Sequence, residues 1–268
     1  MIIVKITSGL GNQLFQYFTA LSISQKINSD LYLDLSAFKN DKLRKFELNQ
    51  FNLSYKIYKP KLLDIFKFQI LKDKQLGFQH NVLSKNDIYL KGYWQSYKYF
   101  DYIKDEIYKS IPRKIDLHKK FNKKKSVNFV SIHVRRGDYI TNPIINRRFK
   151  TCSVEYFNKS IKLLESKENN LQLVFFSEDF NYIKQTFSKY KDAIFLKPDI
   201  NNPLNDLAIM YNCNHNIISN STFSWWGAWL NKTPNKKVIC PDSWFFLDKD
   251  NFFLKDLIPN DWLQIEND

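Results

Sequence analysis

Two adjacent arginines follow an apolar stretch of this sequence, at a position where their charges could bind an anion. The stretch VSIHVRRGDY (130–139) alternates apolar and polar residues, as a strand of an α/β sheet does, and then reaches Arg135 and Arg136. Two neighbouring guanidiniums repel each other unless an anion or a carboxylate lies between them. Because arginine suits bidentate binding of phosphate or carboxylate, the pair predicts a site for a doubly negative ligand.

Two more polar clusters follow predicted strands in the same half of the chain. They are SED (177–179) and SNSTFS (219–224), the second at the start of a helix expected over 223–231. The carboxyl ends of parallel strands share one edge of a sheet, and the free N–H groups of a helix start suit phosphate. The clusters therefore predict a diphosphate cradle, beside which Glu178 or Asp179 would accept hydrogen bonds from a ribose or a guanine edge.

Each cluster also has a purely structural interpretation. The arginines could form ion pairs within the protein, SED could be a solvated loop, and SNSTFS could only cap its helix. The recurrence of polar clusters at three equivalent strand ends favours a shared ligand over three separate structural roles.

Metal and triad chemistry are not expected. The histidines lie far apart, and the D-x-D pattern DKD (248–250) sits in a C-terminal loop with a lysine between its carboxylates. The sequence also has no G-x-S-x-G motif of the kind that presents a nucleophilic serine. An anionic ligand would therefore be held by arginines and helix N–H groups.

The spacing of apolar residues predicts an α/β protein with mainly parallel sheets. A β-α-β unit opens the chain, with strand, glycine turn, helix and second strand at 1–6, 8–12, 12–27 and 31–35. After the lysine-rich NKKKS (122–126), strands and helices alternate; the strands are expected over 127–134, 171–177, 193–196, 215–219 and 237–240. Helices are expected between them, over 153–165, 180–189, 202–213 and 223–231. We therefore expect two lobes, 1–122 and 123–268.

Composition limits the class of protein. The 268 residues, of which 44% are hydrophobic and 16% aromatic, can bury a sizeable core and argue against disorder. No apolar run approaches the ~20 residues of a membrane span. The N-terminus lacks the features of a signal peptide, and Cys152, Cys213 and Cys240 form no C-x-x-C pair. These features predict a cytoplasmic protein, and peripheral association with the inner face of the membrane stays an open alternative.

The formal net charge of +14 invites a nucleic-acid interpretation. The lysines are scattered, however, in a sequence rich in Asn, Ile, Phe and Tyr, which is more typical of a coding bias than of a basic groove. A general effect on solubility or at a membrane surface is therefore favoured over a nucleic-acid site.

Four motifs in this order resemble a known family. They are SGLGNQLFQYFTALSIS (8–24), LKGYWQSYKYF (90–100), HVRRGDY (133–139), and SNSTFSWWGAWL (219–230) followed by VICPDSWF. Together they resemble the bacterial α-1,2-fucosyltransferases of glycosyltransferase family 11, over residues 9–245. The resemblance implies a GT-B-like fold with two Rossmann-type lobes and a central cleft. It also implies GDP-fucose as donor and inverting transfer to a galactose 2-hydroxyl without metal or other cofactor.

The resemblance also implies roles for residues of the second lobe. Arg136 would hold the β-phosphate of GDP and Arg135 would support the loop, while His133 and Asp179 would line the guanosine pocket. Further substrate-binding residues are expected at Glu178, Asn220, Ser221, Thr222, Phe223 and Ser224. The tryptophans could stack on sugar, although helical spacing favours packing for Trp225, Trp226 and Trp229.

Three residues are expected to be catalytic. Arg136 would stabilise the negative charge that develops on the leaving GDP. Asp138 would accept the acceptor proton, with an ion pair to a neighbouring arginine as the alternative. Asn12, in a turn similar to the N-terminal loop of protein O-fucosyltransferases, would face the same reacting centre, with a helix cap as its alternative.

These expectations combine into a metal-independent galactoside 2-α-L-fucosyltransferase of O-antigen or other surface-polysaccharide synthesis. The lobe 123–268 would bind GDP-fucose, and the lobe 1–122 a galactose-containing glycan, for which a lipid-linked form stays open. The acceptor-side residues cannot be identified, since residues 36–88 match no family pattern. A fucosyltransferase of another linkage, or a basic nucleic-acid- or membrane-binding protein with a Rossmann-like core, is the alternative; nucleic acid is not the expected partner.

Overall fold

The chain divides into two compact units. Unit 1 comprises Met1–Pro112 and Phe252–Pro259, and unit 2 comprises Arg113–Asn251 and Asn260–Asp268. The chain therefore passes between the units after residues 112, 251 and 259. The computed structural model describes residues 1–41, 43–60, 67–73, 77–82, 87–111, 114–247 and 250–267.

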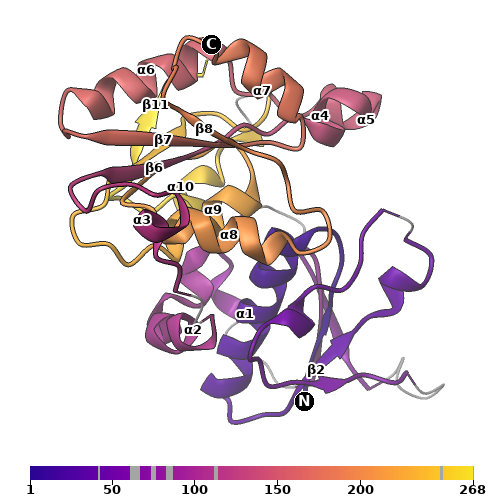
Figure 1. The fold of residues 1–268 in the computed structure, drawn as a ribbon. Coiled ribbons are helices and arrows are strands. Elements are labelled where there is room, and N and C mark those ends of the chain that lie inside the picture. The colour runs from indigo at the N-terminus through magenta and orange to yellow at the C-terminus, as the bar shows by residue number, and fades with distance from the viewer. Residues whose placement is uncertain are drawn as a thin grey trace. The chain divides into compact units, whose positions relative to one another are not determined.

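Unit 1 is built on a wholly parallel five-stranded sheet in the order β3-β2-β1-β5-β4 (Figure 1). Its strands are β1 (Ile2–Lys5), β2 (Leu31–Asp34), β3 (Lys56–Ile57), β4 (Gln69–Lys72) and β5 (Ile88–Lys91). Its α-helices are α1 (Leu10–Lys26), α2 (Lys104–Ser110) and α10 (Leu254–Leu257). Short 3-10 helices cover Ser36–Lys39, Leu48–Gln50, His80–Val82, Tyr97–Tyr99 and Asp101–Ile103.

The first β-α-β unit forms as predicted, except for the details of its turn. The helix α1 begins at Leu10, two residues earlier than expected, with Gly9 at the N-cap position. The left-handed residue of the turn is Ser8, with φ 66°, and not a glycine. Asn12 is therefore the third residue of the helix, and the interpretation of Asn12 as the helix cap is wrong.

The C-terminal segment of unit 1 is attached through one aspartate. The Asp256 carboxylate accepts a hydrogen bond from the Phe78 backbone N–H at 3.1 Å and forms an ion pair of 2.6 Å with Lys98. The Ser96 hydroxyl donates to the backbone carbonyl of Asp256 at 2.7 Å. Residues 252–259 are thus an integral part of a unit whose sheet ends more than 150 residues earlier.

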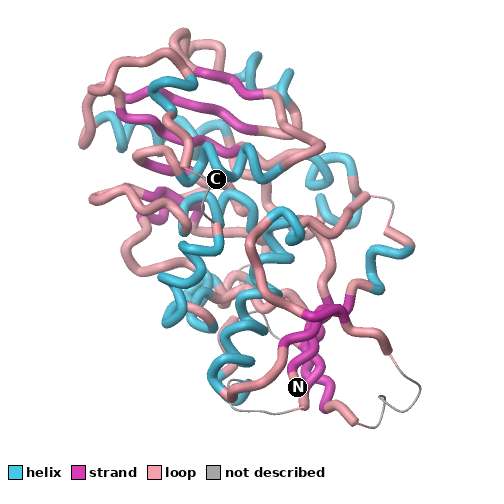
Figure 2. Tube along the Cα trace, turned by 60° about the horizontal axis from the view of Figure 1, so that its bottom comes forward, coloured by secondary structure: helices cyan, strands magenta, loops and turns pink. Residues whose placement is uncertain are grey.

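Unit 2 is built on a six-stranded parallel sheet in the order β11-β10-β9-β6-β7-β8. Strands are drawn in magenta in Figure 2. Its strands are β6 (Asn128–His133), β7 (Leu171–Phe176), β8 (Ile194–Leu196), β9 (His215–Ile217), β10 (Val238–Pro241) and β11 (Leu263–Ile265). Its longer helices are α6 (Val154–Glu165), α7 (Phe180–Thr186), α8 (Pro203–Tyr211) and α9 (Thr222–Trp229). One-turn helices are α3 (Leu117–Lys120), α4 (Gly137–Thr141) and α5 (Pro143–Asn146).

Both faces of the unit 2 sheet are buried, and alternate residues of each strand face opposite layers. Val130 and Ile132 belong to a core cluster with residues of α6 and α7. Phe129 and Val174 belong to a second cluster with residues of α3 and α8. This alternation follows from the two-residue period of a strand. Because both faces are buried, β7 (LQLVFF) is largely apolar, whereas β6 also buries the polar side chains Ser131 and His133.

The predicted class, α/β with mainly parallel sheets in two lobes, is confirmed. The predicted elements from 127 to 240 form within a few residues of their expected bounds. The strands β3 and β4 were not predicted, because they are short and largely exposed and so lack an apolar pattern. None of the described helices combines the length and the apolarity needed to cross a bilayer.

Candidate active site

The three polar clusters of unit 2 follow three neighbouring strands. In the sheet, β6 lies between β9 and β7, and its His133 is in register with Phe176 at the end of β7. Ile132 is in register with Ile217 at the end of β9. All three strands are parallel, so the residues that follow them emerge at one edge of the sheet. The prediction that these clusters converge is confirmed.

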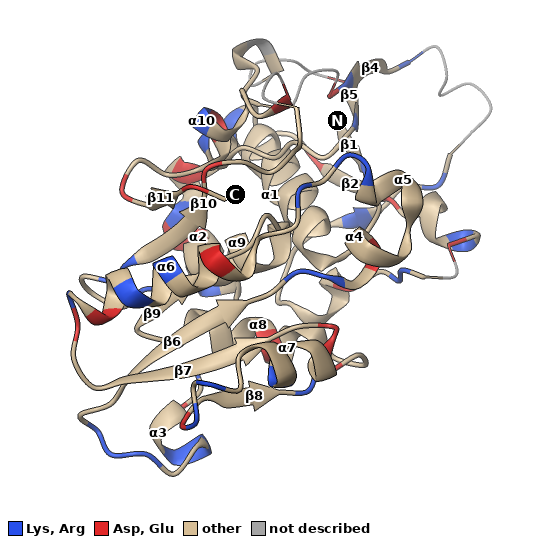
Figure 3. Cartoon of the chain, turned by 90° about the horizontal axis from the view of Figure 1, so that it is seen from above, with Lys and Arg blue, Asp and Glu red and all other residues tan. Residues whose placement is uncertain are grey.

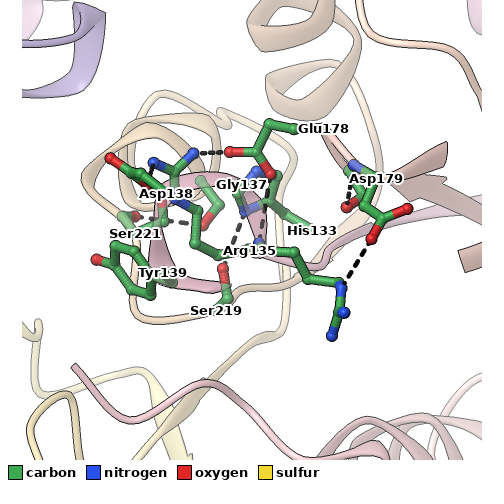
Figure 4. A network of polar contacts seen from close by, with 12 residues as sticks. His133, Arg135, Gly137, Asp138, Tyr139, Glu178, Asp179, Ser219 and Ser221 are labelled. Atoms are coloured by element: carbon green, nitrogen blue, oxygen red, sulfur yellow. Dashed lines mark hydrogen bonds and ion pairs between the residues drawn. The ribbon is translucent and has the colours of Figure 1, made fainter. Parts of the chain in front are cut away.

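Arg135 is fully occupied by carboxylates of the protein. One terminal nitrogen pairs with Asp138, three residues later in α4, and the other pairs with Glu178 after β7 (Figure 4). Its guanidinium also lies 5.1 Å from the centre of the Tyr139 ring. The arginine therefore ties the loop after β6 to the loop after β7, which is the supporting role expected of it.

Arg136 is held differently, and only in part. Its Nε donates to Asp179 at 3.1 Å, and its guanidinium carbon lies 3.5 Å from the centre of the Tyr182 ring. In the described part of the chain its two terminal nitrogens have no hydrogen-bond or ion-pair partner. The carboxylate and the ring thus fix the plane of the guanidinium, while its outer fork stays available for an anion.

His133 is the last residue of β6 and is buried at this edge of the sheet. Its Nδ1 lies 2.9 Å from the hydroxyl oxygen of Ser219, and both side chains are buried. Burial, and then the positive charge of Arg135, lowers the pKa of His133 to about 3. The imidazole is therefore neutral at physiological pH, and it offers a fixed hydrogen-bonding edge without adding a charge to the arginines.

The start of helix α9 supplies unpaired donors. Ser221 occupies the N-cap position but its side chain makes no capping hydrogen bond. The backbone N–H groups of Thr222 and Phe223 belong to the first turn, where a helix has no acceptor of its own. The hydroxyl of Ser224 donates to the Ser221 carbonyl at 3.2 Å. The helix start therefore resembles an anion site in its backbone, while the Ser224 hydroxyl is used within the helix.

Both ends of the Asn220 side-chain amide contact other residues of unit 2. Its Nδ2 donates to the carbonyls of Lys150 at 2.5 Å and Trp244 at 3.0 Å, and its Oδ1 lies 3.8 Å from the Cys152 sulfur. Its backbone carbonyl accepts from the Tyr139 hydroxyl at 3.0 Å. Asn220 thus positions the loop before α9, and its amide is not turned towards a ligand.

The acidic pair after β7 lies where the sequence places it but has partners in the protein. Asp179 caps α7 by accepting from the Tyr182 backbone N–H at 3.1 Å, and its second oxygen holds Arg136. Glu178 pairs with Arg135, and its other oxygen lies 3.4 Å from the Arg136 backbone nitrogen. Both carboxylates thus position the arginines. The sequence alone predicts that they contact a ribose or a guanine, and it does not predict this role.

The tryptophans of α9 are packing residues. Trp225, Trp226 and Trp229 are buried, and the rings of Trp225 and Trp229 stack with centroids 5.8 Å apart. A further ring, Trp262, lies 5.7 Å from Trp225. The helical spacing predicted this packing role, and the alternative of sugar stacking is wrong because none of these rings is accessible.

Unit 1 presents a second candidate region, the turn between β1 and α1. The Asn12 Oδ1 accepts a hydrogen bond from the Gln95 side chain at 2.8 Å. Gln13 donates to the carbonyls of Ser8 and Lys45, each at 2.8 Å. The Asn12 side chain is half-buried, and its Nδ2 has no partner within the described residues. An amide donor is thus held in a fixed orientation at this turn.

Several residues of the site were not found from the sequence. Tyr182 lies three residues after Asp179, on the same face of α7, and this spacing could have pointed to it. Ser219 and Tyr139 lie within the motifs SNSTFS and HVRRGDY but were given no role, because they contact residues 86 and 81 positions away, which no local pattern encodes.

Metal-binding geometry is absent among the residues that the structure describes, where no three His, Cys, Asp or Glu side chains are grouped to hold an ion. Of the DKD pattern, Asp248 and the lysine lie outside the described residues, and only Asp250 is placed.

The class of protein follows from comparison with known families. Residues 1–265 match glycosyl transferase family 11, and the chain belongs to that family. The predicted resemblance is therefore confirmed, and the chain is a glycosyltransferase.

Two proteins of Escherichia coli and one solved structure are similar to this chain over most of its length. The α-1,2-colitosyltransferase of Escherichia coli is 32% identical, with 99% of each chain covered. The O-antigen biosynthesis glycosyltransferase WbnK, also of Escherichia coli, is 32% identical over 90% of this chain and 93% of that protein. The crystal structure of POFUT1 in complex with GDP-fucose is similar in fold, with a TM-score of 0.54 and 12% identity, covering 89% of this chain and 97% of that one. The two-lobed fold is thus of the GT-B-like type.

Proposed function

We propose that the protein is an inverting glycosyltransferase that moves L-fucose from GDP-fucose to the 2-hydroxyl of a β-galactoside. The observation that carries this proposal is the arrangement of Arg136. Asp179 and Tyr182 fix its guanidinium, and its outer fork is available at the sheet edge where the unpaired donors of α9 begin. A diphosphate is the ligand that such a combination of fork and helix start suits best.

The mechanism follows from where charge develops. When the bond between the anomeric carbon and the β-phosphate breaks, negative charge grows on GDP and positive charge on the sugar ring. Arg136 and the first-turn N–H groups of Thr222 and Phe223 would stabilise the growing negative charge, because they are oriented before the reaction starts. These fixed donors supply the charge that a metal ion would otherwise supply, so we propose that the reaction needs no metal.

The remaining residues position this machinery. Glu178 and Asp138 hold Arg135, which keeps the loop of Arg136 in place. Neutral His133, anchored on Ser219, would offer hydrogen bonds to the guanosine part of the donor. The Asp138 carboxylate is engaged by Arg135, and this favours the positioning role over proton abstraction.

Unit 1 would contribute to acceptor binding. The free amide nitrogen of Asn12, oriented by Gln95, is a neutral donor suited to a sugar hydroxyl. The natural acceptor we propose is a galactose-containing glycan of a bacterial surface polysaccharide, since WbnK is an O-antigen biosynthesis glycosyltransferase and spans nearly the same length.

A second donor is favoured by one comparison. The Escherichia coli relative that covers 99% of this chain is an α-1,2-colitosyltransferase. Colitose is L-fucose without its 3-hydroxyl, so the two GDP-sugars share every group that unit 2 would bind and differ at one position of the sugar.

The test is a transfer assay with both donors. The purified protein is incubated with GDP-fucose or GDP-colitose and with lactose or a lactoside, and the product is analysed by mass spectrometry and NMR. We expect an α-1,2-linked product, with the higher kcat/KM identifying the donor. A product of another linkage, or a folded protein that does not bind GDP, would overturn the proposal.

A further inference from the structure

An exposed apolar surface lies on unit 2, just after the loop that carries Arg135 and Arg136 (the arginine loop). Ile140 in α4 and Ile144 in α5 are exposed, the second to 82%. Phe246 and Leu247, from the segment after β10, are exposed as well. Side chains of this size usually lie inside a soluble protein, and four of them on two adjoining segments mark a contact surface. We call these four residues the apolar surface.

The two segments that carry the apolar surface are joined to each other. Phe149 and Phe245 form an antiparallel bridge, and their rings lie 4.7 Å apart. The backbone N–H of Phe246 donates to the Arg148 carbonyl at 3.2 Å. The α5 helix runs directly into this bridge, because the Phe149 N–H donates to the Ile145 carbonyl at 2.9 Å. The exposed side chains are therefore held on a common support.

Two exposed arginines follow α5 beside the apolar surface, while Asp250 lies three residues after Leu247 in the other segment. Arg147 and Arg148 are exposed, and within the described residues neither has a carboxylate partner. The Arg148 guanidinium lies over the rings of Phe149 and Phe245, at 5.9 and 5.0 Å. The nearby Arg135, by contrast, is paired with two acids.

The apolar side chains and the two arginines together indicate what kind of surface binds here. Apolar side chains beside unpaired arginines suit a layer that is apolar inside and anionic at its surface. A second copy of the chain suits it poorly, because a two-fold contact would bring the same arginines of both copies together. Figure 3 shows α4 and α5 as two short, adjoining helices.

We infer that the apolar surface, with Arg147 and Arg148, docks the protein on an anionic lipid bilayer. The isoleucines and Phe246 enter the boundary between headgroups and acyl chains, and the arginines contact phosphate groups. The inference goes beyond the proposed function and does not depend on it. Arg136 lies four residues before Ile140 and eight before Ile144, so a bilayer contact here would bring the loop after β6 near the membrane surface.

The test is flotation of the purified full chain with vesicles of phosphatidylglycerol and phosphatidylcholine, or of phosphatidylcholine alone. We expect binding to the anionic vesicles, weakened by salt. Arg147→Gln with Arg148→Gln should reduce the partition coefficient about fivefold for each arginine. Ile144→Ser with Phe246→Ser should reduce it at least as strongly. Thermal melting checks that each variant is folded.

Matched controls separate docking from general charge. Ile200 is also 82% exposed but lies before α8, and Lys124 and Lys125 are an exposed basic pair near α3. We expect Ile200→Ser and Lys124→Gln with Lys125→Gln to bind anionic vesicles like the wild type. Equal losses in the controls and the test variants would overturn the assignment. So would dimerisation that the apolar substitutions abolish while vesicle binding stays absent, since a second copy would then be the occupant.

Discussion

The turn after β1 in unit 1 and the loop after β6 in unit 2 follow equivalent parallel strands but use opposite chemistry. The first is held by neutral amides: Gln16 accepts from the Thr7 N–H at 2.9 Å and donates to the Gly92 carbonyl at 3.1 Å. The second is held by ion pairs of Arg135 and Arg136 with three acids.

The difference follows from what each network leaves open. The buried glutamines Gln13 and Gln16 make their hydrogen bonds within the protein, while the Asn12 Nδ2 has no partner among the described residues. Among the described residues of unit 2, the two terminal nitrogens of Arg136 have no partner, so a charged donor is available there. A neutral amide such as that of Asn12 suits a sugar hydroxyl, whereas the charged guanidinium of Arg136 suits a leaving diphosphate. This difference supports the proposal that the two loops bind acceptor and donor separately, and the following substitutions test that proposal.

The largest effect is expected from Arg136→Ala. Loss of one fixed donor to a developing charge lowers kcat/KM for GDP-fucose about 10²- to 10³-fold. Arg136→Lys keeps the charge but loses the planar fork, so it should recover only part of the activity. Lys162→Ala, an exposed cation on α6, is the control. Near-normal kcat/KM in a folded Arg136→Ala protein would remove this residue from the donor site.

Asp138→Asn distinguishes a positioning residue from a base. The substitution leaves Arg135 paired with Glu178 alone, so we expect GDP affinity to fall about tenfold, in line with a lost charged hydrogen bond, and kcat to change less. Calorimetric titration with GDP and steady-state kinetics measure the two quantities. A large fall in kcat at unchanged GDP affinity would instead identify Asp138 as the base.

His133 predicts a pH dependence of stability. Its pKa is lowered to about 3 in the folded protein, below the unfolded value of about 6.5, so between these values the unfolded chain binds more protons. The free energy of unfolding therefore falls as pH falls from 6.5 towards 3, by at most about 1.4 kcal/mol per pH unit from this group. Urea unfolding at several pH values should show a smaller dependence in His133→Asn than in the wild type. The exposed His80→Asn serves as control, and equal slopes in all three proteins would contradict the prediction.

Asn12→Ala should have a smaller effect, confined to the acceptor. Removal of one neutral hydrogen bond, worth about 1 kcal/mol, raises the acceptor KM or lowers kcat several-fold and leaves GDP affinity unchanged. Gln95→Ala should act in the same direction, because Gln95 orients the Asn12 amide. If either variant loses GDP binding, the division of roles between the two loops is wrong.

The smallest effect is expected from chelation. If arginine and helix N–H groups alone neutralise the leaving diphosphate, then EDTA leaves the rate of transfer unchanged. The measurement is kcat with and without EDTA, followed by addition of manganese. Loss of activity that manganese restores would contradict the assignment of this role to the loop after β6.

The sequence predicted where the three polar clusters of unit 2 lie better than it predicted their contacts. The ends of β6, β7 and β9 could be located because apolar alternation and the shared edge of a parallel sheet are local or general rules. The pairing of Arg136 with Asp179, 43 residues away, and of Asn12 with Gln95, 83 residues away, depends on how side chains meet across elements. A sequence pattern shows which residues are charged or carry amides, but it does not show which of them pair in the folded protein.

The return of Phe252–Pro259 to unit 1 has a consequence for synthesis and for engineering. A ribosome that has released residues 1–251 has still not delivered Asp256, which binds Lys98 and Phe78, or β11, the last strand of unit 2. Neither unit can be complete before the end of the chain emerges. A chimera between family members spliced once after residue 112 would join residues 1–112 of one parent to residues 252–259 of the other within unit 1, so an exchange of unit 1 must carry residues 252–259 with it.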